Sequence, residues 1–343
     1  MIEILKTSHA DQEEKPGRIS VVIPTRGRPA LVDRAVRSAL IQDFADLEVI
    51  VVIDGPDPQT ESALNLLDDP RLHLLSLPAT VGGAEARNTG IRYARGKWIA
   101  LLDDDDEWLP GKLNRQYCAA EAIPGPYVLV SCKFIERTES ADRLLPCRPY
   151  DRREAFSDYM FARRGWHSGE GFLQTSTWFV SRQLLTDMPF TPGLARCQDL
   201  DWLLHATAQP VTRVAIVDET LAIFHHDERA ERVSRTADWK FLYDWATANK
   251  RYFTLRAFSF FIATFCVPSA AKQRAGIRTF LYLLRQCLFF GSPTLKCLTL
   301  FFCCWWMSEE RRRSLRALAF TFTHMFSPKS PQLIRESLPE KAS

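Results

Sequence analysis

The sequence lacks a hydrophobic run long enough to cross a membrane, and it lacks a cysteine pattern that would hold zinc. Its two most apolar stretches, residues 255–267 and 295–307, fall short of the roughly 20 apolar residues that a span requires. The nine cysteines have no metal-ligand spacing, so we interpret them as reduced thiols of a cytoplasmic protein. Residues 1–17 lack the apolar core of a signal peptide, and we expect them to form a loose tail.

Acidic side chains are almost missing from residues 251–329. This segment contains twelve Lys or Arg residues, and its acidic residues are Glu309 and Glu310. Its net charge is +10, and because the whole chain has a formal charge of +3, the remainder has a net charge of −7. An acidic front with a basic tail favours an anionic surface as the partner of the tail. We therefore expect a membrane surface as a partner and no nucleic acid.

Short apolar runs alternate with helical patterns through the first 122 residues. The predicted strands are 19–24, 47–54, 72–77 and 98–102, and the predicted helices are 30–41, 60–67, 83–93 and 111–122. Such alternation indicates an α/β fold with a parallel, doubly wound sheet.

The pattern becomes less regular after residue 122. Residues 128–136, 175–181 and 211–224 resemble strands, a helix begins at Gln198, and residues 138–171 form a polar, loop-rich stretch. From residue 241 onward the chain has helical character.

Four consecutive aspartates, Asp103 to Asp106, follow the fourth apolar run directly. In an open α/β sheet, ligands bind beyond the carboxyl ends of the strands. Four adjacent like charges repel one another, and a divalent cation removes that cost. Carboxylate oxygens suit Mg²⁺ and Mn²⁺, so we predict a metal site here. A solvated acidic turn is the alternative.

Four short segments combine strand endings with glycine and polar residues. They are Ile-Ser-Val-Val-Ile-Pro-Thr at 19–25, Ile-Val-Val-Ile-Asp-Gly at 50–55, Gly-Gly-Ala-Glu-Ala-Arg-Asn-Thr-Gly at 82–90 and Leu-Asp-Asp-Asp-Asp-Glu-Trp-Leu-Pro at 102–110. Together they resemble the family 2 glycosyltransferases, and the resemblance covers roughly residues 19 to 235. It implies a GT-A fold, which is a Rossmann-like, mostly parallel sheet flanked by helices. It also implies a nucleotide-sugar donor, a divalent metal and inversion at the anomeric carbon.

The resemblance gives the aspartates separate roles, because Asp103 and Asp105 match the outer positions of an Asp-x-Asp motif. We expect Asp105 to bind the metal, Mn²⁺ or Mg²⁺, and Asp103 to bind the ribose or the metal. Asp104 is the middle residue, and a solvated side chain and a contact with the donor remain equally open for it.

Other donor-binding residues follow from the same resemblance. Asp54 is expected to recognise the nucleotide base or ribose, with an Asx-type turn before Gly55 as the compatible alternative. Thr25 and Arg26 are expected to face the nucleotide. Arg87 is expected to pair with phosphate or stack on the base, and an ordinary surface arginine is its alternative.

The resemblance assigns the general base to Asp199, which would take a proton from the acceptor hydroxyl. Family members commonly have Glu where this chain has Gln198, so the base lacks a neighbouring acid. A simple helix cap is the alternative for Asp199. We expect Asp201 to point elsewhere on the same helix.

Two adjacent histidines, His225 and His226, precede the segment at 232–234. Neighbouring residues of a strand face opposite sides, so at most one of the two lines the site. The resemblance suggests His225 as a ligand of the metal or the diphosphate and suggests that residues 232–234 close over the donor. A histidine packed beneath the sheet is the alternative.

The predicted organisation has four parts. They are a tail at 1–17, a glycosyltransferase domain at 18–240 with a donor half at about 18–125 and an acceptor half at about 126–240, a helical basic region at 241–330, and a tail at 331–343. No Gln-x-x-Arg-Trp motif of processive synthases and no multi-span region is present, which favours transfer of a single sugar. We expect a UDP-sugar donor and a glycan or lipid-linked acceptor, in the synthesis of cell-surface polysaccharide or lipopolysaccharide.

The predicted location is the cytoplasmic face of the cell membrane. Basic residues beside the apolar runs at 255–267 and 295–307, and Trp305 with Trp306, suggest helices lying in a membrane interface. The alternative is that these runs bury one another in a helical bundle or a dimer.

Two rival functions remain open at this point. A sugar-1-phosphate nucleotidyltransferase shares an acidic metal site, but residues 25–28 form a poor version of its glycine-rich phosphate loop. A non-catalytic carbohydrate-binding or scaffold protein is the second rival, and Asp199 together with the aspartate cluster argues against it.

Overall fold

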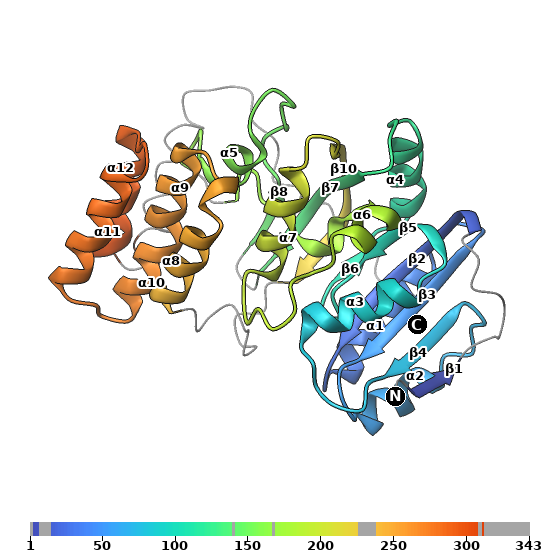
Figure 1. Cartoon of the computed structure of the whole chain (residues 1–343). Helices are drawn as coiled ribbons and strands as arrows, with labels where there is room; N and C mark the ends of the chain where they lie inside the picture. The colour runs from blue at the N-terminus through green and yellow to red at the C-terminus, as the bar shows by residue number, and fades with distance from the viewer. Residues whose placement is uncertain are drawn as a thin grey trace.

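The computed structural model describes residues 3–6, 15–138, 141–166, 169–225, 238–307 and 311, and its described strands form one ten-stranded sheet. The strand order is β1-β4-β3-β2-β5-β9-β7-β10-β6, with β8 paired to β7 (Figure 1). The strands are β1 (Glu3–Lys6), β2 (Lys15–Thr25), β3 (Leu47–Ile53), β4 (Leu72–Ser76), β5 (Gly96–Leu101), β6 (Glu107–Trp108), β7 (Val128–Arg137), β8 (Asp142–Leu145), β9 (Phe179–Ser181) and β10 (Arg213–His225). The fold is α/β, as predicted.

Helices cover both faces of the sheet, and further helices follow it in the chain. Those of the α/β part are α1 (Pro29–Leu40), α2 (Pro58–Asn65), α3 (Gly83–Tyr93), α4 (Lys112–Glu121), α5 (Phe156–Phe161), α6 (Arg182–Asp187) and α7 (Gln198–Thr207). Those of the C-terminal helical region are α8 (Trp239–Ala248), α9 (Leu255–Phe261), α10 (Val267–Lys272), α11 (Ile277–Phe289) and α12 (Leu295–Trp306).

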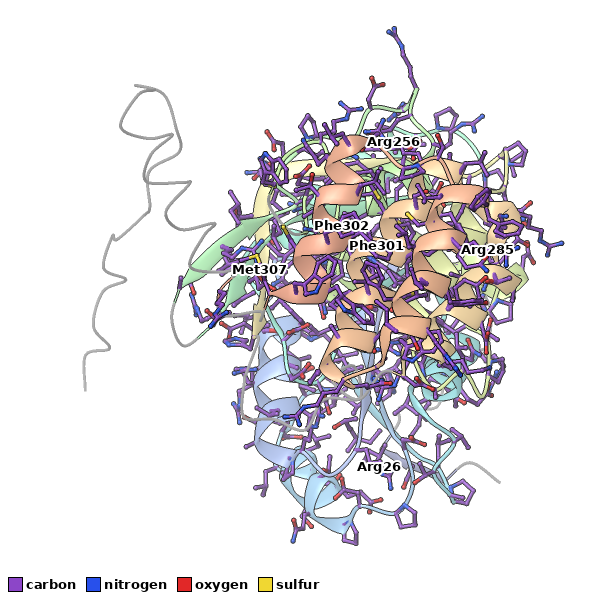
Figure 2. All side chains as sticks on the ribbon, turned by 90° about the vertical axis from the view of Figure 1, so that its left-hand side faces the viewer. Arg26, Arg256, Arg285, Phe301, Phe302 and Met307 are labelled. Carbon is purple, nitrogen blue, oxygen red and sulfur yellow. The ribbon has the colours of Figure 1, made fainter. Side chains whose placement is uncertain are left out.

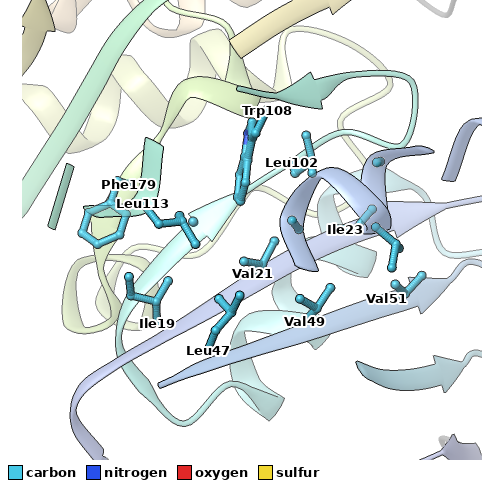
Figure 3. Close-up of a cluster of buried hydrophobic side chains, with 14 of the residues drawn as sticks. Ile19, Val21, Ile23, Leu47, Val49, Val51, Leu102, Trp108, Leu113 and Phe179 are labelled. Carbon is cyan, nitrogen blue, oxygen red and sulfur yellow. The ribbon is translucent and has the colours of Figure 1, made fainter. Parts of the chain in front are cut away.

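The strands β4, β3, β2 and β5 are mutually parallel and buried on both faces. Alternate residues of each strand point to opposite faces, so Val21 and Val49 pack with α1 and α4 while Val22 and Ile50 pack with α3 and α6. Figure 3 shows part of the first cluster, in which Trp108 lies at one edge near Leu102. The near-continuous apolar runs of these strands are what a parallel sheet with two covered faces requires.

The structure differs from the sequence-based elements in three places. Residues 3–6, expected to be loose, form β1 and pair with β4. The predicted strand at 175–181 begins as a 3₁₀ turn (Thr175–Thr177), because the Gln174 side chain accepts a hydrogen bond from the Ser176 N–H, and β9 starts only at Phe179. The loop-rich stretch at 138–171 contains β8 and α5.

The C-terminal helical region has its own apolar core and packs against α5 and α7 (Figure 1). The run at 255–267 supplies this core, since Phe258, Phe261 and Val267 are at most 1% exposed. Most of this run is therefore buried in the helical bundle, which is the alternative expectation, although Leu255 and Phe265 are 55% and 37% exposed. Contact of the run with a membrane stays a prediction. Within the described residues, no helix is both long and apolar enough to cross a membrane.

Candidate active site

The candidate site lies at the carboxyl ends of β2, β3 and β5. The chain adds β3 and β4 on one side of β2 and then crosses back to place β5 on the other side. Ligands of open α/β sheets bind at such a switch point. Thr25 ends β2, Asp54 follows β3 and Asp103 follows β5, so three predicted site residues start from this edge.

Asp104, the middle residue of the Asp-x-Asp pattern, points into the protein. It accepts hydrogen bonds from Thr25 Oγ1 at 2.8 Å and from Arg28 Nη1 at 3.1 Å. Burial raises the pKa of Asp104 to about 6, and the charge of Arg28 opposes that rise. The alternative of a solvated side chain is wrong, because Asp104 and Thr25 join the ends of β5 and β2.

Asp106, the last of the four aspartates, received no role of its own from the sequence. It is fully buried, and it accepts hydrogen bonds from Gln174 Nε2 and Ser176 Oγ, both at 2.6 Å, and from the His225 backbone N–H at 3.2 Å. Burial raises the pKa of Asp106 well above its usual range. This carboxyl group ties the 174–177 turn and the end of β10 to the aspartate loop.

The outer aspartates, Asp103 and Asp105, keep 23% and 24% of their side chains exposed. Arg87 Nη2 donates to Asp103 Oδ1 at 2.5 Å, and Arg28 Nη1 lies 3.4 Å from Asp105 Oδ2. These arginines offset part of the repulsion among the four carboxylates. A divalent cation would add to this compensation, and the outer pair remains suited to bind one.

The chemistry of the two outer carboxylates fits a metal such as Mg²⁺ or Mn²⁺, which prefers oxygen ligands. The ring of His225, the third expected ligand, has Nε2 at 3.5 Å from Glu107 Oε1, and this contact lowers the pKa of Glu107. In the part of the chain that the structure describes, no group of three or more His, Cys, Asp or Glu side chains is arranged to hold a metal. Metal binding by Asp103, Asp105 and His225 stays a prediction.

Helix α7 brings Asp199 to the aspartate loop through Arg87. The Arg87 guanidinium bridges the two elements, because Nη1 donates to Gln198 Oε1 at 3.3 Å while Nη2 is bound to Asp103. Burial raises the pKa of Asp199, the positive charge of Arg87 lowers it, and the negative charge of Asp103 adds to the rise. A carboxylate with a raised pKa is a stronger base, as proton removal requires.

The start of α7 does not use Asp199 as its N-cap. The N-cap residue is Cys197, whose backbone is left-handed with φ of 59° and whose side chain makes no capping hydrogen bond. A non-glycine residue in this conformation costs on the order of 1 kcal/mol, and such strain is common beside functional residues. Asp199 is therefore not the N-cap residue, although backbone hydrogen bonds at the helix start, from Leu200 and from Asp199 itself, lower its pKa.

Asp54 is held by backbone amides. Its Oδ1 accepts from the Val81 N–H at 2.7 Å and its Oδ2 from the Gly82 N–H at 3.0 Å, so it fixes the loop that leads into α3. Arg26 is exposed on the turn after β2 (Figure 2). A role for either residue in donor binding remains a prediction.

Several polar residues of the site were missed by sequence patterns. They are Arg28, Arg34, Gln174 and Ser176, of which Arg34 donates to the backbone carbonyl of Asp105. They contact the aspartates from segments 68 to 76 residues away, and the turn after β2 offered a signal through its two arginines. His226 and residues 232–234 lie outside the described residues.

A mostly parallel sheet with an acidic loop after β5 and an acid on α7 defines the class of GT-A glycosyltransferases. The chain matches the family described as Glycosyl transferase family 2 over residues 20–187, and it belongs to that family. It is therefore an enzyme that transfers sugars. This membership sets aside both rival functions, nucleotidyl transfer and non-catalytic binding.

Individual relatives differ in how much they share with this chain. The amylovoran biosynthesis glycosyltransferase AmsB of Erwinia amylovora is 26% identical over 69% of this chain and 79% of its own length. The UDP-Glc:alpha-D-GlcNAc-diphosphoundecaprenol beta-1,3-glucosyltransferase WfgD of Escherichia coli is 34% identical, but the match spans only 29% of this chain and 39% of WfgD.

Among solved structures, TarS of S. aureus, residues 1–349 in complex with UDP-GlcNAc, has a TM-score of 0.56 with 16% identity. The structural match covers 87% of this chain and 83% of the TarS chain. At 16% identity, the similarity to TarS shows a shared fold and nothing more.

Proposed function

We propose that this chain is an inverting, metal-dependent transferase that moves one sugar from a nucleotide-sugar donor to a lipid-linked glycan. The product would serve the assembly of a cell-surface polysaccharide or lipopolysaccharide. The observation that supports the proposal most directly is the meeting of Asp103, Arg87 and Asp199 at the switch point of the sheet. These residues come from three elements. Arg87 is hydrogen-bonded to Asp103 and to Gln198, the neighbour of Asp199, and its charge acts on the Asp199 carboxyl. A cation-binding carboxylate and a base would thus lie close together.

Asp199 would act as the general base. As the acceptor oxygen bonds to the anomeric carbon from one face, its proton passes to the Asp199 carboxylate. On the opposite face the bond from the anomeric carbon to the diphosphate oxygen breaks, and its electron pair leaves with the nucleoside diphosphate. Attack opposite the leaving group inverts the anomeric centre, so no covalent sugar–enzyme intermediate is required.

The departing diphosphate gains negative charge, which the site must stabilise. Arg28 and Arg87 already lie beside the outer aspartates, and positive groups aimed at developing charge are a large source of catalysis. Asp105 and Asp103 would hold a divalent cation, which supplies further positive charge to the diphosphate when bound. Thr25 and Asp54 would shape the nucleotide side of the site by fixing the loops around it.

The substrates and location are inferred from the relatives' names and from the charge of the chain. TarS was solved with UDP-GlcNAc, which supports a UDP-sugar as donor. WfgD is described as acting on a diphosphoundecaprenol-linked sugar, which supports a lipid-linked acceptor. We propose peripheral association with the cytoplasmic face of the cell membrane.

A panel of nucleotide sugars tests the donor and metal together. Thermal stability of the purified protein should rise with its true donor in the presence of Mn²⁺, and much less in chelator. Asp105→Asn should lose the Mn²⁺-dependent part of that rise. Loss of one such electrostatic partner typically lowers the transfer rate by about 10²-fold or more.

The matched control for Asp105→Asn is Asp33→Asn, which removes a carboxylate of α1 that is 33% exposed and is paired with Arg37 of the same helix at 2.8 Å. This variant should bind donor as the wild type does. Full transfer by the wild type in chelator would refute the metal assignment, and no response to any nucleotide sugar would refute the donor class.

A further inference from the structure

The solvent-facing side of α11 is apolar where a surface helix is normally polar. Ile277, Leu281 and Phe289 are 63%, 56% and 76% exposed, and their spacing of four and eight residues places them on one side of the helix. Tyr282 and Leu288 flank them and are also exposed. The opposite side of α11, including the fully buried Leu283, packs into the helical core.

Helix α12 repeats this arrangement beside α11. Leu295 and Trp306 are 83% and 62% exposed, with Phe302 between them at 38%, again along one side of the helix. Phe280 of α11 packs against Phe301, whose ring is fully buried, so the two helices form one unit. Figure 2 looks directly at these two helices. We call the exposed side of α11 and α12 the outer face.

Every charged side chain on this face is basic. Arg278 and Arg285 lie within the apolar stripe of α11, and Lys296 lies at the start of α12. The sequence from residue 245 to residue 307 contains no Asp or Glu. The last preceding acid, Asp244, is paired with Lys240 at 2.6 Å.

We propose that the outer face docks onto an anionic lipid bilayer. Aromatic and aliphatic side chains on an interfacial helix enter the boundary between headgroups and acyl chains, while Arg and Lys attract anionic lipids. Apolar area gathered on neighbouring helices marks an interaction surface more strongly than single exposed residues do. A second copy of this chain is disfavoured as the occupant, because face-to-face pairing would bring Arg278 and Arg285 against like charges, and α11 and α12 as described contain no acid to offset them.

The outer face continues into the acceptor half of the enzyme. Lys296 donates to the Arg164 backbone carbonyl, and its ammonium lies 5.4 Å from the ring centroid of Trp166, which is 52% exposed. Docking would therefore bring the 163–166 segment to the bilayer together with α12. The idea that docking brings the active site to its acceptor rests on the proposed transfer to a lipid-linked glycan. Docking itself is measured by vesicle binding, which needs no transfer.

Vesicle binding of the full chain tests the inference. The protein should float with vesicles of phosphatidylcholine and phosphatidylglycerol at low salt, and it should not float with phosphatidylcholine alone. Phe289→Ser with Trp306→Ser should weaken binding by about tenfold or more, since two exposed apolar anchors are lost. Arg278→Ser and Arg285→Ser should each weaken it by about fivefold and reduce its salt dependence.

Two controls lie on the far side of the molecule in Figure 1. Leu66→Ser removes an 85% exposed apolar side chain at the end of α2, and Arg115→Ser removes an exposed arginine of α4. Neither should change vesicle binding, and no variant should change the unfolding temperature by more than a few degrees. Donor-induced thermal shifts should persist in all of them, which separates failure of docking from failure of the proposed function.

Three outcomes would overturn the proposal. The wild type could ignore anionic vesicles at low salt. It could bind vesicles with no loss in the outer-face variants. It could form a dimer that the outer-face variants convert to monomers while vesicle binding is absent, and the face would then belong to self-association.

Discussion

At the scale of single residues, the four consecutive aspartates divide into two pairs with different surroundings. Asp104 and Asp106 turn inward and bind neighbouring polar groups, whereas Asp103 and Asp105 keep about a quarter of their side chains exposed. The inner pair builds the loop, and the outer pair is left to act on a ligand. The four aspartates lie on a turn closed by a hydrogen bond from the Asp106 N–H to the Asp103 carbonyl at 3.2 Å, and the two pairs have different partners on it.

Asp104 leads to a prediction about pH. Its pKa is raised to about 6 in the folded protein, so the folded state holds this proton more tightly than the unfolded state does. Stability contributed by the protonated form is present at low pH and is lost as pH rises from about 4 to about 6. In Asp104→Asn this loss should disappear, which changes the difference in unfolding free energy between about pH 4 and about pH 7 by up to about 3 kcal/mol.

Urea unfolding of both proteins in chelator measures this difference. The Asn variant also loses one acceptor for Thr25 or Arg28, and this loss lowers its free energy of unfolding by the same amount at every pH. The comparison therefore concerns the slope of stability against pH. Parallel curves for the wild type and the variant would show that Asp104 does not titrate in this range.

At the scale of elements, α7 is clamped between the α/β part and the C-terminal helical region. Asp201, two residues after the proposed base, accepts hydrogen bonds from Thr191 Oγ1 at 2.6 Å and from the Trp245 indole N–H at 2.9 Å. Asn249 donates to the same carboxylate at 3.4 Å. The expectation that Asp201 points elsewhere than Asp199 is confirmed, and its partner on α8 links that helix to the element that holds the base.

Trp245→Phe tests this clamp, because it keeps an aromatic ring and removes the N–H that Asp201 accepts. We expect the free energy of unfolding to fall by about 1.5–3 kcal/mol, the range for a hydrogen bond to a charged group. Transfer activity should fall with it if α7 loosens. Trp239→Phe is the matched control on the same helix, since Trp239 packs on the Tyr282 ring near the surface and should change stability much less. Equal effects of the two variants would contradict the clamp.

The sequence predicted most elements of the parallel half of the sheet, because buried strands such as β3 are continuous apolar runs and their helices have clear periodicity. It also proposed Asp103, Asp105, Arg87 and Asp199 as site residues, because they lie in recognisable motifs, and their roles stay predictions. It could not predict the contact of Gln174 with Asp106, which depends on tertiary folding. Nor could it separate the buried run at 255–267 from the exposed side of α12, since both are apolar and differ only in what they pack against.

At the scale of the whole molecule, the C-terminal helical region is part of the enzyme's fold. Leu200 and Leu204 of α7 belong to its apolar core, together with Trp245 and Phe261. A chain cut after residue 238 would expose Leu204 and remove two donors from the buried Asp201. We expect this truncated chain to be insoluble or to unfold well below the wild-type temperature, as each lost apolar side chain contributes about 1.5–3 kcal/mol. A soluble truncated chain with wild-type thermal stability would show that the region is dispensable.

Transfer by Asp199→Asn is the measurement that tests the central claim most directly. The variant and the wild type are compared with the same nucleotide sugar, Mn²⁺ and a diphosphoundecaprenol-linked acceptor, and donor binding is followed by thermal shift. The site predicts that the variant binds donor as the wild type does but loses transfer by about 10²-fold or more, since an amide cannot accept the proton. Transfer by the variant at the wild-type rate would contradict the assignment of Asp199 as the base.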